Sequence, residues 1–129
     1  MGLSILHEPQ DPKSTTATLS GQINGQTSGR LDRELRGLLQ QGVCSLVLDL
    51  AQVDLVSSAG VGVILNTRKL LKQREGDLAL VNLQPQVERA FEVMSLLPKL
   101  NIFNNVQELD EYLIKIQDRI REEGSLADD

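Results

Sequence analysis

Two adjacent serines are the residues of this 129-residue chain best placed to do chemistry. Ser57 and Ser58 follow an apolar run and precede Gly60 and Gly62, and an apolar segment with basic residues near its end then continues to Leu71. This pattern predicts a strand followed by a helix that begins at the serines. A hydroxyl at a helix start can cap one of the unpaired backbone N–H groups. The positive end of the helix dipole also favours a phosphate there.

The sequence supplies no catalytic partner for these serines. The run from Val56 to Gly60 half resembles the Gly-x-Ser-x-Gly elbow of hydrolases, but its first glycine is absent. The single histidine, His7, lies upstream of the serines, whereas those hydrolases place it last. One histidine and one cysteine exclude an ordinary zinc site. We therefore predict a protein without enzymatic activity, metal or cofactor, in which a serine is either modified or simply caps a helix.

The two glycines at this helix start need an explanation, because each costs about 1 kcal/mol against alanine within a helix. One explanation is close packing of the helix against the sheet. The other is that a partner must approach the helix backbone at Gly60 or Gly62. The sequence leaves both explanations open.

Composition indicates one globular domain, with 40% hydrophobic and 24% charged residues. The net charge of −5 and the lack of a dense basic patch argue against a nucleic-acid partner. No apolar run of membrane-spanning length and no signal peptide are evident, so we expect a cytoplasmic protein without a membrane partner. Cys44 stands alone and is expected to be a buried, inert thiol. We place the domain at residues 1–122 and expect the acidic residues 123–129 to fray.

Hydrophobic periodicity predicts the element order β-β-α-β-α-β-α-β-α. The expected strands lie at 3–5, 15–19, 46–50 (buried on both faces and followed by a link centred on Asp54), 78–83 and 102–103. The expected helices cover 31–39 (capped by Thr27 or Ser28, with Gly42 just past its end), 58 to about 74, 85 to about 97 (with Val87, Ala90, Phe91 and Met94 inward and Pro98 closing it), and the segment from Asn105 through Leu109, Leu113, Ile116 and Ile120. This order predicts an α/β fold, a four- to five-stranded mixed sheet with about four helices mainly on one face.

The arrangement resembles the STAS domain of bacterial anti-sigma factor antagonists over roughly residues 1–112. The resemblance is carried by Leu19–Asn24, Leu48–Leu50, Val53–Gly62 and Val87–Leu100. The family reads Asp-Ser-Ser/Thr-Gly-Leu-Gly at the helix start, where this chain reads Ser57-Ser58-Ala59-Gly60-Val61-Gly62. The resemblance places the phosphorylated serine at Ser58, with Ser57, at the position of the family's Asp, as the competing acceptor. Gln22 and Asn24 stand where the family often has Glu and Asp.

The resemblance implies a phosphorylation-switched anti-sigma factor antagonist. An anti-sigma factor that is also a serine kinase would modify Ser58, a PP2C-type phosphatase would reverse this, and the unphosphorylated form would bind the kinase and release its target. The expected partner-binding residues are Gln22, Ile23, Asn24, Ser57, Ser58, Ala59, Gly60, Val61, Gly62 and Asn66. The alternative is a non-phosphorylated STAS accessory subunit of a lipid- or anion-transport system. In either case the expected state is a monomer or weak dimer.

Overall fold

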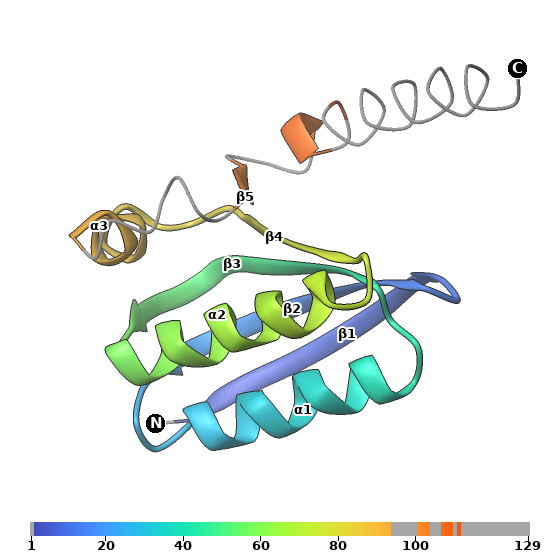
Figure 1. The fold of residues 1–129 in the computed structure, drawn as a ribbon. Helices are drawn as coiled ribbons and strands as arrows, with labels where there is room; N and C mark the ends of the chain where they lie inside the picture. Colours follow the sequence, from blue (N-terminus) through green and yellow to red (C-terminus); the bar gives the residue numbers. More distant parts are fainter. Residues whose placement is uncertain (1, 94–100, 104–106, 110, 112–129) are drawn as a thin grey trace, which may run out of the picture.

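The computed structural model describes residues 2–93, 101–103, 107–109 and 111, which form one mixed five-stranded sheet with its helices (Figure 1). The strands are β1 (Leu3–Asp11), β2 (Ser14–Ile23), β3 (Ser45–Val56), β4 (Asp77–Val81) and β5 (Asn101–Phe103), in that spatial order. The helices are α1 (Ser28–Gln40), α2 (Ser58–Lys72) and α3 (Pro85–Val93). β1 and β2 pair antiparallel, and every later pair is parallel. The predicted fold class is confirmed.

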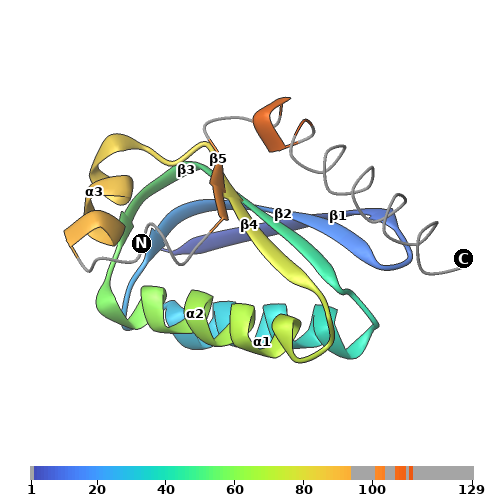
Figure 2. The same ribbon diagram turned by 45° about the horizontal axis from the view of Figure 1, so that its top comes forward.

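The helices α1 and α2 lie side by side against one face of the sheet, as Figure 2 shows. Alternation along β4 separates the two faces, because successive side chains of a strand point in opposite directions. Leu78 and Leu80 join the main core, whereas Ala79 and Val81 pack with Leu109. The helical turn that carries Leu109 therefore covers the face opposite α1 and α2.

The first three strands are longer than predicted, and β1 reaches Asp11 instead of ending at Ile5. β2 continues through Gly21 to Ile23, and β3 continues through Asp54 to Val56 without the predicted link. Two β-bulges allow this, because two residue steps on β2 face three on β3 between Thr18 and Ser20, and one step faces two between Gly21 and Gln22. The bulges let β3 stay paired until the residue before Ser57.

β3 is not buried on both faces, which corrects a second expectation. Leu46, Leu48 and Leu50 are fully buried under α1 and α2. Val47 is only partly buried, against the smaller cluster around Leu109. A nearly continuous apolar run does not tell how completely each face of the strand is covered, because both faces then carry apolar residues.

The structure also tests the predictions for Cys44 and for the helix that begins at Pro85. Cys44 is partly exposed rather than buried, so the expectation of a buried thiol is wrong. Pro85 opens α3, and its Val87 and Phe91 are buried as predicted. Within the described residues, no helix is both long and apolar enough to cross a membrane. The predictions for Met94, Pro98, Asn105, Leu113, Ile116, Ile120 and residues 123–129 lie outside the described residues.

Candidate functional site

The two serines occupy different positions at the start of α2. Ser57 is the N-cap, with extended backbone angles, and its Oγ accepts a hydrogen bond from the Gly60 N–H at 3.4 Å. Ser57 is half-buried, whereas Ser58 is the first helical residue and is exposed. Asp, Asn, Ser and Thr are preferred at the N-cap because their side-chain oxygen accepts a hydrogen bond from an otherwise unpaired backbone N–H group. The freely accessible hydroxyl at this site is therefore that of Ser58.

A backbone hydrogen bond joins the end of β2 to the start of α2. The Ser57 N–H donates to the Ile23 carbonyl at 2.8 Å, so two segments that are distant in the sequence meet here. The resemblance implied that both segments belong to one partner-binding surface, and this hydrogen bond shows that they are adjacent. The carboxyl ends of parallel strands are the usual place for a functional site in such sheets.

The loop after β2 is held by Thr27 and Asn24. The Thr27 hydroxyl donates to the Gln22 carbonyl at 2.8 Å and accepts from the Asn24 N–H at 2.9 Å. The Asn24 Oδ1 accepts from the N–H groups of Gln26 and Thr27 at 2.9 and 3.1 Å. Thr27 is the N-cap of α1 by position, but its side chain caps no helical N–H group. The signal available in the sequence was Asn24, because an Asn side chain often bonds the backbone N–H two residues on and so favours a turn.

Gly60 and Gly62 have different surroundings. A Cβ on Gly60 would lie 2.4 Å from Cγ2 of Ile23, so only glycine fits there without a shift. A Cβ on Gly62 would meet no atom within 4 Å, and Gly62 is exposed. Packing of the helix against the sheet thus explains Gly60 and does not explain Gly62.

The sequence pattern of the STAS domain family matches residues 8–109, which is most of the chain. This chain belongs to the STAS domain family. Two relatives carry related names. BtrV of Bordetella bronchiseptica, described as an anti-sigma factor antagonist, is 36% identical over 89 residues, covering 69% of this chain and 77% of that protein. The anti-sigma F factor antagonist of Paenibacillus polymyxa is 31% identical over 88 residues, covering 67% and 75%.

Two solved structures superpose on this chain and share its fold. The anti-sigma factor antagonist SpoIIAA in its unphosphorylated form superposes with a TM-score of 0.73 at 18% identity, covering 84% of this chain and 96% of that one. The phosphorylated form of Bacillus SpoIIAA gives a TM-score of 0.65 at 17% identity, covering 84% and 99%. At these identities the likeness concerns the fold alone.

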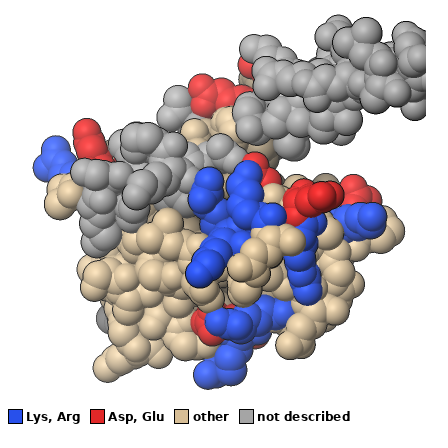
Figure 3. Space-filling model, in the orientation of Figure 1, with Lys and Arg blue, Asp and Glu red and all other residues tan. Residues whose placement is uncertain are grey.

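The STAS domain exposes only part of the predicted partner-binding set. The side chains of Ile23 and Val61 are buried, so they support the site from below. The exposed members are Ser58, Ala59 and Gly62, and the half-buried members are Gln22, Asn24, Ser57 and Asn66. Figure 3 shows that the surface over the amino-terminal half of α2 carries no charged side chains. A phosphate on this surface would be its dominant charge.

The chain's one histidine, the usual general base for a serine nucleophile, lies far from Ser58. His7 is exposed in the middle of β1, where it pairs with Ala17. Ala17 is six residues before Ile23, or about 20 Å at strand spacing. The part of the chain that the structure describes also contains no cluster of three His, Cys, Asp or Glu residues suited to a metal. The exposed hydroxyl of Ser58 is open to contact or modification by another molecule.

Proposed function

We propose that this chain is an anti-sigma factor antagonist whose binding to an anti-sigma serine kinase is switched by phosphate on Ser58. The names of its relatives support the first half of this proposal. The observation that carries the second half is the exposed hydroxyl of Ser58 at the first residue of α2. Gly62 and Asn66 follow Ser58 at intervals of four residues, so they share one stripe of the helix with it.

Accessibility favours Ser58 over Ser57 as the acceptor. A kinase must bring the γ-phosphate of ATP into line with the attacking hydroxyl, which requires an exposed side chain. The Ser57 hydroxyl is half-buried and already accepts the Gly60 N–H group. Phosphate on Ser57 would be attached to the oxygen that accepts the Gly60 N–H, whereas phosphate on Ser58 would leave that hydrogen bond unchanged.

The charge of the phosphate acts on the complex and leaves the fold intact. A phosphoserine adds about −1.5 to −2 charge at neutral pH. At the amino-terminal end of α2 this charge is favoured by about 0.3–1 kcal/mol. A partner surface shaped for the uncharged half of α2 would instead have to bury the phosphate without a counter-charge, which costs several kcal/mol. The unphosphorylated form therefore binds the kinase and releases its captive target, and a PP2C-type phosphatase restores this form.

Incubation with Mg-ATP and the serine kinases encoded beside this gene tests the proposal. Intact mass should show one added phosphate on the wild-type chain, and phosphopeptide mapping should place it on Ser58. The Ser58→Ala variant should take up no phosphate, while Ser57→Ala, the matched control, should still be modified. Phosphate on Ser57 would contradict the proposed site. No phosphate with any of these kinases would favour a non-phosphorylated accessory subunit of a transport system.

A further inference from the structure

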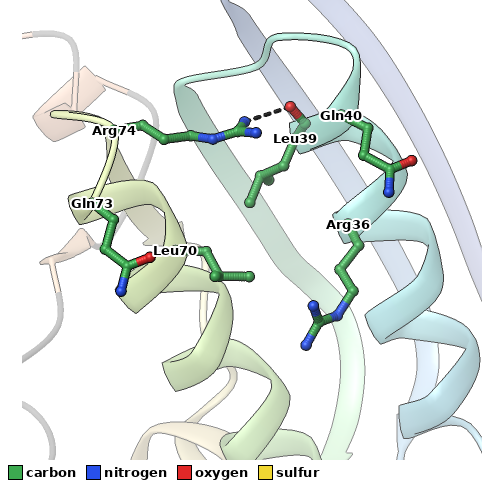
Figure 4. Close-up of a pocket in the computed structure, with 6 residues that line it drawn as sticks. All are labelled: Arg36, Leu39, Gln40, Leu70, Gln73 and Arg74. Atoms are coloured by element: carbon green, nitrogen blue, oxygen red, sulfur yellow. Dashed lines mark hydrogen bonds between the residues drawn. The ribbon is translucent and has the colours of Figure 1, made fainter.

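A small cavity opens between the carboxyl-terminal ends of α1 and α2, at the opposite end of α2 from Ser58. Its volume is about 230 Å³, and its lining residues are Arg36, Leu39, Gln40, Leu70, Gln73 and Arg74 (Figure 4). Arg74 reaches across from the end of α2 and donates a hydrogen bond to the Leu39 carbonyl. The cavity thus combines two leucine side chains with two guanidinium groups and two amides.

The surface around this cavity is basic although the chain as a whole carries a net charge of −5. Figure 3 shows Lys and Arg side chains gathered over this end of the helix pair. Among the described residues, Arg36 pairs with Asp32 at 2.9 Å and Lys72 with Asp77 at 3.3 Å. No acidic side chain of that part of the chain pairs with Lys69 or Arg74.

The helix dipole accounts for only some of these cations. Lys69 and Lys72 lie in the last turn of α2, where positive charge favours the helix. The last turn of α1 contains no basic residue, and Arg36 lies before it. The dipole effect fades beyond the last turn, and Arg36 is held there by its pair with Asp32, with half of its side chain still exposed beside the cavity.

We infer that this cavity is a second docking site for the same anti-sigma kinase, and that it takes an acidic segment of that partner with an apolar residue between its carboxylates. This inference rests on the proposed function. The apolar side chain would contact Leu39 and Leu70, while flanking carboxylates would pair with Arg36 and Arg74. Arginine suits this role because its planar group binds a carboxylate through two parallel hydrogen bonds.

One partner can reach both ends of α2. The 15 residues of α2 span about 22 Å at the helical rise of 1.5 Å per residue. A standard interface covers roughly 800 Å² on each partner, which is a patch about 30 Å across. At physiological salt the Debye length is about 8 Å, so a phosphate on Ser58 is largely screened from the cavity. The two sites should therefore act independently on affinity.

The test measures binding of the kinase identified by Ser58 phosphorylation, using calorimetry on the full chain. Gln73→Glu places a negative charge at the cavity without removing a contact that the structure shows, and Arg36→Gln removes one cation. Their controls are Gln52→Glu and Arg89→Gln, which make the same changes at exposed positions outside the cavity. Each cavity variant should weaken binding about five- to tenfold and flatten its salt dependence, while each control stays within about twofold of wild type.

The outcomes separate this inference from the proposed function. If the wild-type chain does not bind the kinase, or Ser58→Glu binds as tightly as wild type, the proposed function fails. If Ser58→Glu loses affinity and the cavity variants do not, this inference fails alone. Tighter binding by the cavity variants would also overturn it, because that result is expected if the chain's own acidic residues 123–129 competed with the partner for the cavity. The effects of Ser58→Glu and Gln73→Glu should multiply when combined.

Discussion

Gly60 of α2 lies directly over the side chain of Ile23 at the end of β2. A Cβ on Gly60 would come within 2.4 Å of Ile23 Cγ2 and 3.1 Å of the Ile23 carbonyl oxygen. The same carbonyl accepts the Ser57 N–H at 2.8 Å. The first turn of α2 is therefore packed against the last residue of β2, and this contact sets the position of Ser58.

Gly60→Ala should destabilise the fold by about 1–3 kcal/mol, because the added methyl group overpacks a filled site. Urea unfolding monitored by circular dichroism measures the change. In an Ile23→Ala background, where Cγ2 is absent, the same substitution should cost less, so the double variant should be less destabilised than the sum of the two single variants. Equal costs in both backgrounds would mean that Ile23 is not the residue that excludes the methyl group.

Gly62→Ala should stabilise the fold and weaken partner binding. Alanine is favoured over glycine within a helix by about 1 kcal/mol, and no atom lies within 4 Å of the new methyl group. Gly37→Ala in α1 is the matched control, since its added methyl group is equally unobstructed. Both variants should raise the urea midpoint, but only Gly62→Ala should reduce affinity for the kinase. Equal affinities for the two variants would remove the reason to place a partner at Gly62.

Ser57→Ala should lower stability by about 1 kcal/mol, because the Gly60 N–H loses its side-chain acceptor. Ser57→Asp keeps an acceptor at the cap and should restore the loss. Thermal unfolding of both variants measures these effects. Kinase assays on Ser57→Ala should still yield one phosphate on Ser58. Ser57 would then contribute to stability, while Ser58 alone would accept the phosphate.

Ser58→Ala and Ser58→Glu should fold like the wild type and differ in binding. The carboxylate of Glu at the first residue of α2 gains about 0.3–1 kcal/mol from the helix dipole. Against the kinase, Ser58→Ala should bind constitutively, and Ser58→Glu should bind at least tenfold more weakly. A Ser58→Glu variant that is unfolded would show instead that the first turn of α2 does not tolerate a charge.

Features that depend on residues close together in the sequence could be predicted from the sequence alone. The Ser57–Ser58 pair predicted a helix start, Pro85 predicted the start of α3, and the order of apolar segments predicted a mixed sheet. Each of these depends on backbone geometry over a few residues, namely unpaired N–H groups, a fixed proline φ or a 3.6-residue period. Their signals therefore survive in the sequence alone.

Tertiary structure decided the properties that depend on residues far apart in the chain. Only the bulged pairing with β2 keeps β3 continuous through Asp54, and only the approach of Ile23 distinguishes Gly60 from Gly62. Likewise, Ile23 belongs to the sequence pattern of the site, yet its side chain is buried beneath it. Burial and close approach are set by which surfaces meet, and a local hydrophobic pattern specifies which residues turn inward without specifying what they meet.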